Sequence, residues 1–257
     1  MRLQNKIAIV TGAGAGIGAA TAVRFAEEGA RLVLVDISDG NAHATSKKIE
    51  DMGAKAIVVA VDISREEDCR HISDAAASAF GGIDILVNNA ADFTTKSVED
   101  AEMADWQKVL GVNVIGTAMV AKYAIPRMKA HTKGRGGSIV NLASMSSIIA
   151  QPNFATYNSS KGAILTMTKC MALDLAPFNI RVNAVCPGCI LTSATEREWK
   201  RMGITQEQWT AQMAPLHMLN RVGDAREVAN ACLFLASDES SFITAAHLMV
   251  DGGYTGR

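Results

Sequence analysis

Tyr157 and Lys161 are four residues apart in "YNSSKGA", a spacing that places both side chains on one face of a helix. An ammonium group near a phenol stabilises the phenolate, so such a tyrosine can act as a general acid or base near neutral pH. Taken alone, the pair is common on solvated helix faces. Ser144 ends the apolar run "SIVNLAS" thirteen residues earlier, and its hydroxyl could bind a substrate oxygen beside the phenol. Together these residues predict proton transfer at a small substrate.

A glycine-rich stretch, "VTGAGAGIGAATA", has the spacing of a dinucleotide site. Gly14, Gly16 and Ala19 fit Gly-x-Gly-x-x-Ala, and Gly12 with Gly16 and Gly18 fits Gly-x-x-x-Gly-x-Gly. Glycines let the backbone turn tightly and approach a pyrophosphate, which then lies at a helix N-terminus. A tight turn without a ligand is the alternative for this motif alone.

Asp36 ends the next apolar run, twenty residues after Gly16. A carboxylate at this place can accept hydrogen bonds from both adenosine ribose hydroxyls and would repel a 2′-phosphate. Ile37 follows and offers no cation to such a phosphate, so the sequence favours NAD over NADP. The alternative for Asp36 is a cap on the helix after Ser38. Asp62 could likewise contact adenine or cap a helix.

Cys186-Pro187-Gly188-Cys189 has the Cys-x-x-Cys spacing of a thiol redox site or half of a zinc site. A redox pair should open a helix of a small thioredoxin-like unit, and zinc would need two more ligands at matching spacing, which the five histidines do not provide. We therefore expect no metal, with Cys186 as a small core residue and Cys189 as a pocket wall near the cofactor. Five sparse cysteines also indicate a reducing compartment.

Short β-branched runs alternate with longer amphipathic stretches along nearly the whole chain. Near-continuous apolar runs indicate strands that are buried on both faces, as in a parallel sheet covered by helices. The alternation predicts an α/β fold: a single domain over residues 1–257 with a doubly wound, seven-stranded parallel sheet and helices on both faces. The expected strands are 6–11, 31–36, 56–62, 83–89, 137–144, 180–187 and 247–253, and the expected helices are 18–28, 40–52, 66–80, 103–129, 155–175 and 225–236.

Residues 189–222 interrupt this alternation with a polar segment in which we expect no strand, only an irregular substrate lid. Polar groups around a substrate are costly to leave unpaired, which favours a small polyhydroxylated compound such as a sugar or sugar acid. The lid tryptophans suit packing within the lid, Arg197 suits a solvated helix face, and His217 suits an ordinary loop, with the pocket mouth as its alternative place. The residues expected to surround the substrate are Asp92, Phe93, Ser146, Gln151, Asn153, Cys189, Trp199 and Trp209.

Composition limits the classes of partner that this chain can bind. Of its 257 residues, 49% are hydrophobic and only 20% are charged. A formal net charge of -1 leaves no basic cluster for nucleic acid or an anionic membrane. The uncharged run 7–23 follows Arg2 and Lys6 as in a secretory signal, but glycines interrupt it and it lacks the apolar density of a membrane span. We expect a cytoplasmic protein with a small-molecule substrate, and neither a nucleic acid nor a membrane as partner.

Six motifs stand in the order of one enzyme family: "TGAGAGIG", "NNA", Asn113, Ser144, Tyr157 with Lys161, and "NAVCPGCILT". In these motifs the whole chain resembles the short-chain dehydrogenases/reductases. The resemblance implies a Rossmann fold and NAD-dependent hydride transfer between a secondary alcohol and a ketone. It implies that Tyr157 moves the proton, Lys161 lowers its pKa and holds the nicotinamide ribose, Ser144 polarises the substrate oxygen, and Asn113 holds a water that relays protons to Lys161.

The same resemblance implies a homotetramer formed through the long helices and "DGGYTGR", and leaves two other functions open. A 3-oxoacyl thioester or hydroxysteroid reductase/dehydrogenase would share every catalytic residue, and a dinucleotide-sensing binding protein would have lost the chemistry. One departure is "NNAA" for the usual "NNAG", which we assign to the substrate pocket. The implied cofactor-binding residues are Gly12, Gly14, Gly16, Ile17, Gly18, Asp36, Ile37, Asp62, Ile63, Asn89, Ala90, Tyr157, Lys161, Pro187, Gly188, Ile190 and Thr192.

Overall fold

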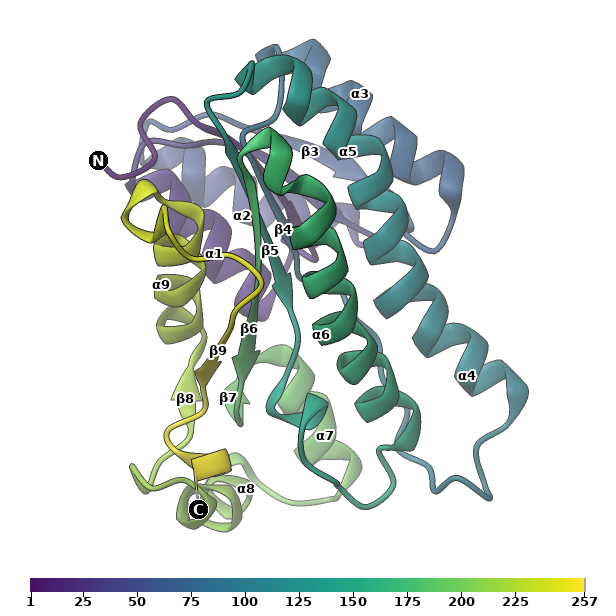
Figure 1. The fold of residues 1–257 in the computed structure, drawn as a ribbon. Helices are drawn as coiled ribbons and strands as arrows, with labels where there is room; N and C mark the ends of the chain where they lie inside the picture. Colours follow the sequence, from purple (N-terminus) through teal and green to yellow (C-terminus); the bar gives the residue numbers. More distant parts are fainter. Residues whose placement is uncertain (257) are drawn as a thin grey trace.

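Seven parallel strands form the central sheet of the computed structural model, which describes residues 1–256 (Figure 1). Their order is β3-β2-β1-β4-β5-β6-β9, so the expected fold class is confirmed. The order reverses between β1 and β4, and ligands of such sheets bind at the carboxyl ends of the strands near that point. Residue 257, which is both the expected end of the domain and the last residue of "DGGYTGR", lies outside the described residues. The strands are β1 (Ile7–Thr11), β2 (Arg31–Asp36), β3 (Ala56–Ala60), β4 (Ile85–Asn88), β5 (Gly137–Leu142), β6 (Ile180–Pro187) and β9 (His247–Val250).

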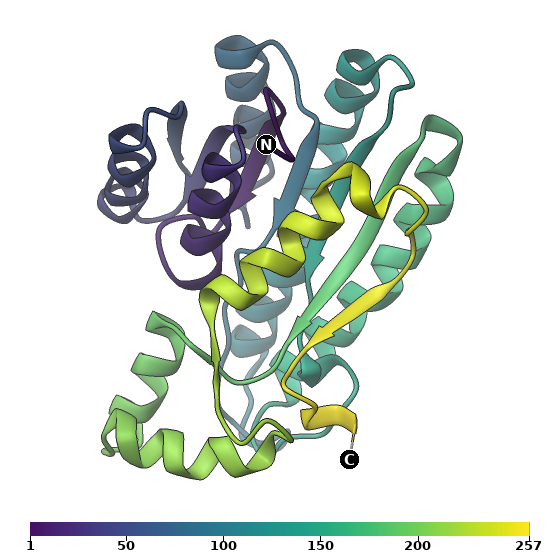
Figure 2. The same ribbon diagram turned by 90° about the vertical axis from the view of Figure 1, so that its left-hand side faces the viewer.

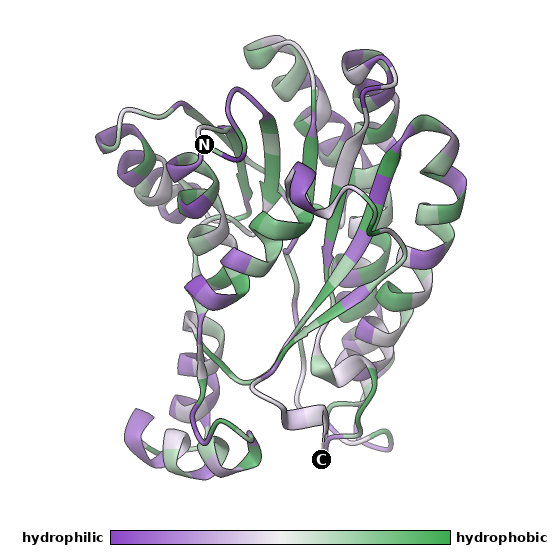
Figure 3. Cartoon of the chain, turned by 60° about the vertical axis from the view of Figure 1, so that its left-hand side comes forward, coloured by the Kyte–Doolittle hydropathy of each residue, from purple (hydrophilic) through white to green (hydrophobic). Residues whose placement is uncertain are grey.

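Helices cover both faces of the sheet, with α9 lying across its near face in Figure 2. Successive strand residues point to opposite faces, so Ala8 and Val10 pack in the core under α1, α2 and α9, whereas Ile9 packs in the core under α3, α5 and α6. This burial on both sides explains the continuous apolar runs, visible as hydrophobic strands in Figure 3. The helices are α1 (Gly16–Glu27), α2 (Asp39–Asp51), α3 (Glu66–Phe80), α5 (Thr117–Thr132), α6 (Ala155–Leu175) and α9 (Ala225–Ala236).

The expected single α-helix over 103–129 is wrong in its interior. The structure has α4 (Met103–Leu110), a π-helical segment (Gly111–Gly116) and then α5, which ends at Thr132. A π turn fits an extra residue into a helix and is frequent at functional sites. Several strands are also shorter than expected, because β3, β4, β5 and β9 end before the polar residues at their carboxyl ends. Those polar residues therefore belong to loops at the sheet edge.

The expected irregular lid without a strand is also wrong. Residues 189–222 contain the two-residue strand β7 (Ile190–Leu191), α7 (Ser193–Arg201) and α8 (Gln206–Met213). Capping boxes begin both helices, at Thr192 and Thr205. β7 pairs with β8 (Gly223–Asp224), which joins the two ends of the segment, and α7 and α8 lie beyond the carboxyl ends of β6 and β9 (Figure 1).

Trp199 and Trp209 give this segment a small core of its own. Their ring centroids are 5.5 Å apart, both rings are buried, and Val222 packs with them. The expected role of the two tryptophans in lid packing is therefore confirmed.

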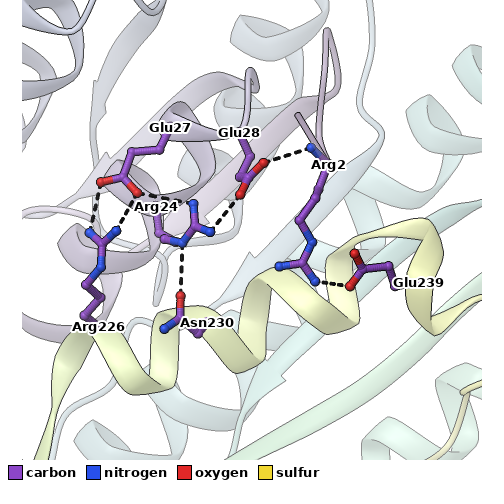
Figure 4. Close-up of polar contacts among 7 residues, drawn as sticks. All are labelled: Arg2, Arg24, Glu27, Glu28, Arg226, Asn230 and Glu239. Carbon is purple, nitrogen blue, oxygen red and sulfur yellow. Dashed lines mark hydrogen bonds and ion pairs between the residues drawn. The ribbon is translucent and has the colours of Figure 1, made fainter.

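A polar network fastens the N-terminus and α9 to α1 (Figure 4). The Arg24 guanidinium donates to Glu28 at 2.7 Å and to Asn230 at 3.0 Å, and Arg226 donates two hydrogen bonds to Glu27. The hydrogen bonds from Arg226 hold the pKa of the Glu27 carboxyl below its usual range. Since α9 follows β8, the network connects the end of the lid to the helix that begins at the glycine turn.

Within residues 1–256, the continuous helix Met103–Thr132 is long and apolar enough to cross a membrane by length and composition. Core helices of soluble proteins pass the same test. This helix packs against α3 and α6, and 39% of its apolar window is buried inside the protein.

Candidate active site

A cleft of about 570 Å³ lies at the carboxyl edge of the sheet. Loops after β1, β2, β3, β4, β5 and β6 line it, together with α6 and the beginning of α7. Of the expected catalytic and cofactor-binding residues, only Gly14, Gly18 and Asn113 lie outside its lining. The expected site residues that line the cleft are Gly12, Gly16, Ile17, Asp36, Ile37, Asp62, Ile63, Asn89, Ala90, Ser144, Tyr157, Lys161, Pro187, Gly188, Ile190 and Thr192.

The glycine turn is packed too closely for side chains. A Cβ on Gly18 would lie 2.0 Å from the Gly12 carbonyl oxygen, and a Cβ on Gly12, whose φ is +66°, would lie 2.7 Å from the Asn89 amide nitrogen. Asn89 donates to the Thr11 carbonyl at 2.8 Å, which ties the end of β4 to the turn. The N-terminus of α1 has no side-chain cap and no acidic residue in its first turn. Its N–H groups are therefore available to an anion such as a pyrophosphate.

Asp36 is held in place by the turn on one side and by the next loop on the other. One carboxylate oxygen accepts from the Gly14 N–H at 2.8 Å, and the other accepts from the Ser38 N–H at 2.9 Å. The carboxylate also lines the cleft, so the capping alternative describes only part of its environment. Asp62 behaves in the same way: it accepts from the Ser64 N–H at 2.9 Å and lines the cleft.

Tyr157 and Lys161 come to the cleft from α6, and Ser144 comes from the loop after β5. The Lys161 side chain is buried; its Nζ donates to the Leu142 carbonyl at 2.7 Å and lies 5.6 Å from the Tyr157 ring centroid. The Ser144 hydroxyl accepts from the Ser146 N–H at 3.1 Å. Phe93 and Phe154 each pack edge-on against the Tyr157 ring at 6.2 Å. These contacts fix the phenol within the cleft.

Burial shifts both proton-bearing groups toward their neutral forms. It raises the pKa of Tyr157, and a hydrogen bond with Ser144 partly opposes that rise. It lowers the pKa of Lys161 from the usual 10.5 to about 8. The two pKa values therefore move apart, that of Tyr157 upward and that of Lys161 downward, and Lys161 carries a charge that is readily lost near pH 8.

This shift predicts a pH-dependent stability difference between the wild type and Lys161→Met. The folded-state pKa of about 8 lies below the usual 10.5, so unfolding takes up a proton between these values and stability rises with pH there. From pH 7 to pH 9, we expect the wild type to gain about 1 kcal/mol in free energy of unfolding relative to the variant. Urea unfolding of both proteins at each pH measures this, and parallel pH profiles would contradict it.

Asn113, in the π-helical segment, connects the loop after β4 with α6 through three hydrogen bonds. Its Nδ2 donates to the Asp92 carbonyl and to the Ser160 hydroxyl, both at 2.9 Å, while its Oδ1 accepts from the Asp92 N–H at 2.7 Å. Ser160 directly precedes Lys161 on α6. Asn113 therefore positions α6 and the loop after β4, and its service as a water holder stays a prediction.

The expected substrate pocket is only partly correct. Asp92 and Phe93 line the cleft, whereas Ser146, Gln151, Asn153, Cys189, Trp199 and Trp209 do not. The Ser146 hydroxyl donates to the Gln151 side-chain oxygen, so these two polar groups satisfy each other. Asn153 is exposed, in a left-handed conformation with φ of 63°.

Cys186 and Cys189 are free thiols at the end of β6. Cys186 is fully buried in the core, as expected. Cys189 lines a neighbouring cavity of about 390 Å³ instead of the cofactor cleft. Burial raises the pKa of both thiols to about 11, which makes them poor nucleophiles near neutral pH.

His217 is not the ordinary loop residue that the sequence suggested, because it is buried. Its Nδ1 lies 2.9 Å from the Met213 carbonyl, its Nε2 accepts from the Cys189 N–H at 3.3 Å, and its ring packs edge-on against Tyr254. His217 therefore holds the end of the lid against the turn after β6. No local sequence signal marks this role, since its partners lie in three separate segments.

Sequence reasoning also missed several residues of the cleft wall. Most are small or apolar residues, and no motif marks them. Arg197 is exposed on α7, as the sequence predicted, and it lines the cleft as well, which the sequence did not predict. The missed lining residues are Ala15, Val35, Ser38, Asn41, Val61, Val112, Leu142, Ala143, Ser193, Ala194, Thr195 and Arg197, whereas Ala91 lines the cleft as the "NNAA" departure predicted.

Comparison with known proteins places this cleft in a family. A protein-family model described as enoyl-(acyl carrier protein) reductase matches residues 12–255. The solved structure of a short-chain type dehydrogenase/reductase from Mycobacterium marinum superposes with a TM-score of 0.92 at 34% identity, covering 99% of this chain and 97% of that one. The chain belongs to the short-chain dehydrogenase/reductase family. As an oxidoreductase of this family, it binds a nicotinamide dinucleotide.

Two curated members of the family differ in what their names say about cofactor and substrate. The NADP-dependent (R)-specific alcohol dehydrogenase of Lentilactobacillus kefiri is 38% identical, over 99% of this chain and 98% of that protein. Trans-4-hydroxycyclohexanecarboxylate dehydrogenase of Sinomonas cyclohexanicum is 36% identical, over 99% of this chain and 94% of that protein. Membership alone therefore decides neither the cofactor nor the substrate of this chain.

Proposed function

We propose that this short-chain dehydrogenase/reductase interconverts a secondary alcohol and a ketone with NAD. The observation that carries the proposal is the meeting of Ser144, Tyr157 and Lys161 with Asp36 and the glycine turn in one cleft. When bound there, the nicotinamide accepts or supplies the hydride. The protein's own part is to orient the two reactants and to move one proton.

In the oxidising direction, the Tyr157 phenolate oxygen accepts the proton of the substrate hydroxyl. The Ser144 hydroxyl hydrogen-bonds the same substrate oxygen and keeps it beside the phenol. The Lys161 ammonium stabilises the phenolate and holds the nicotinamide ribose, and Asn113 holds a water that relays the proton toward Lys161. In the reducing direction, Tyr157 returns the proton to the oxygen of the ketone. Because burial favours the neutral phenol and oxidation needs the phenolate, oxidation should accelerate as pH rises from 6 to 8.

NAD is the proposed cofactor because a fixed carboxylate faces the place of the adenosine ribose. Asp36 is oriented by two backbone N–H groups and would repel a 2′-phosphate. Ile37 lines the same end of the cleft and offers no positive charge. The remaining proposed cofactor contacts are those of the glycine turn, Asp62 with Ile63, Asn89 with Ala90, and the turn from Pro187 to Thr192.

The proposed substrate is a small polar secondary alcohol, such as a sugar acid or another hydroxy acid. Gln151 and Asn153, which favoured sugars in the sequence, lie outside the cleft lining. Asp92 remains in the wall and pairs with Lys108 at 2.9 Å, while Phe93 adds an aromatic surface beside Tyr157. A substrate with both a polar group and some apolar carbon surface suits this wall. A family relative whose name specifies a hydroxycyclohexane carboxylate supports this choice.

The test is the change in nicotinamide absorbance with NAD and secondary alcohols: sugars, sugar acids, hydroxy acids, cyclic alcohols and steroids, with oxoacyl thioesters in the reducing direction. We expect turnover confined to small polar alcohols. Turnover only of thioesters or steroids would replace the proposed substrate class and keep the mechanism. Binding of NADH without any turnover would support the dinucleotide-sensing alternative.

We further propose one catalytic domain with a substrate lid over 189–222, assembled as a cytoplasmic homotetramer without a nucleic acid or membrane partner. The joined ends of the lid at β7 and β8 support the first part. Exposed apolar side chains support the second, since Leu173 on α6 and Phe242 before β9 are 77% and 102% exposed. Sedimentation at micromolar concentration tests the tetramer, and a stable monomer would contradict it.

A further inference from the structure

Arg197 is a solvent-exposed cation that also lines the cleft. It lies on α7, four residues after Ser193, and both residues line the cleft, as this helical spacing requires. Its helix neighbours pair with one another: Lys200 with Glu196 and Arg201 with Glu198, each at 2.7 Å. Among residues 1–256, Arg197 has no hydrogen-bond or ion-pair partner.

The other charged residues of the cleft wall are already satisfied. Asp36 and Asp62 accept backbone N–H groups at the ends of β2 and β3. Asp92 pairs with Lys108, and Lys161 donates to the Leu142 carbonyl. An arginine remains charged at every physiological pH, and its planar guanidinium matches a carboxylate with two parallel hydrogen bonds. Arg197 is therefore the one charged residue of the described cleft wall that has no hydrogen-bond or ion-pair partner.

Arg197 lies apart from the glycine turn, where we expect the pyrophosphate of the cofactor to bind. Thr192, which caps α7, lies against the glycine turn, because a Cβ on Gly16 would be 3.2 Å from the Thr192 Cβ. Arg197 lies five residues farther along the helix, about 7.5 Å at 1.5 Å per residue. The pyrophosphate already has the uncapped N-terminus of α1.

We propose that Arg197 binds the anionic group of the substrate and makes the enzyme selective for hydroxy acids over the corresponding neutral alcohols. This proposal deepens the proposed function and rests on it. The substrate would be a secondary alcohol that carries a carboxylate, with its carbon skeleton against Phe93 and its hydroxyl at Tyr157.

The experiment compares acid and neutral partners in the wild type, Arg197→Gln and Arg201→Gln. Gluconate is paired with glucose, and 4-hydroxycyclohexanecarboxylate with cyclohexanol. Arg201→Gln is the matched control, because it removes the same charge from the same helix at a residue outside the cleft lining. Arg197→Gln is expected to lower kcat/KM for the acid about 50-fold, mainly through KM. The neutral partner and the Kd of NADH should change less than twofold, and Arg201→Gln should change none of these values.

Other outcomes identify what is wrong. A tenfold rise in the Kd of NADH with Arg197→Gln would place the guanidinium on the cofactor's pyrophosphate and overturn the proposal. Equal losses for acid and neutral partners, or no loss, would also overturn it.

A wild type that oxidises none of these alcohols would contradict the proposed function, and binding then tests Arg197 separately. With NADH present, either acid should raise the unfolding temperature of the wild type and of Arg201→Gln but not of Arg197→Gln. Absence of any shift in the wild type would overturn the proposal.

Discussion

Replacing Tyr157 by phenylalanine is expected to lower kcat about 10³-fold while the Kd of NADH stays within twofold of the wild type. The substitution removes only the hydroxyl that takes up the substrate proton. It keeps the ring, which packs edge-on against Phe93 and Phe154 at 6.2 Å, so the wall of the cleft should remain intact. Steady-state oxidation of the best alcohol substrate and fluorescence titration with NADH measure the two quantities.

Tyr123→Phe is the matched control for this result. The Tyr123 hydroxyl donates to Glu66 at 2.8 Å on the outer side of α5, away from the cleft. Its loss should leave kcat unchanged within twofold. If Tyr157→Phe retained more than a tenth of the wild-type kcat, Tyr157 would not be the proton-transferring group, and the proposed chemistry would have to be assigned to another residue.

The double substitution Asp36→Ala with Ile37→Arg is expected to reverse the cofactor preference. It removes the carboxylate that repels a 2′-phosphate and adds a cation that can pair with it. Ile37 is 74% exposed at the end of the cleft, so an arginine there has room to turn toward the phosphate. We expect the ratio of kcat/KM for NADP to that for NAD to rise about 10²-fold to 10³-fold.

Two further variants test the cause of that reversal. Asp36→Asn removes the charge and can keep the hydrogen bond from either Gly14 or Ser38, so it should reproduce part of the change with little loss of stability. Asp62→Asn removes a charge from the neighbouring strand end and should leave the preference unchanged. An equal effect of Asp62→Asn, or no effect of the double substitution, would show that the adenosine ribose lies elsewhere.

The residues that the sequence marked as a candidate site lie together around one cleft, and their motifs are local. The glycine turn needs neighbouring residues without side chains, as the 2.0 Å separation at Gly18 shows. Tyr157 and Lys161 need only one helical turn between them. Parallel strands bring their carboxyl ends to one edge of the sheet. Asp36 and Ser144 follow from this general rule, because each lies at or just after the carboxyl end of a strand.

The π-helical segment shows where local reasoning failed. Residues 111–116 are glycines, β-branched residues and Asn113, all weak helix formers, but nothing in that composition separates a π turn from an α turn. The lid is a different case, since Thr205 and Gln208 form a capping box that is visible in the sequence and marks the start of α8. This capping box predicts a helix that begins after Thr205, in place of the irregular segment that we expected.

The sequence by itself determined the fold class, the family resemblance, the dinucleotide turn and the tyrosine–lysine pair, because each depends on residue types at fixed short spacing. The tertiary structure decided which polar side chains face the cleft. Gln151 and Arg197 are equally polar in the sequence, yet Gln151 is satisfied by Ser146 outside the cleft lining, whereas Arg197 lines the cleft without a partner. That difference depends on the path of distant segments around the sheet edge, and the proposed selectivity for hydroxy acids rests on it.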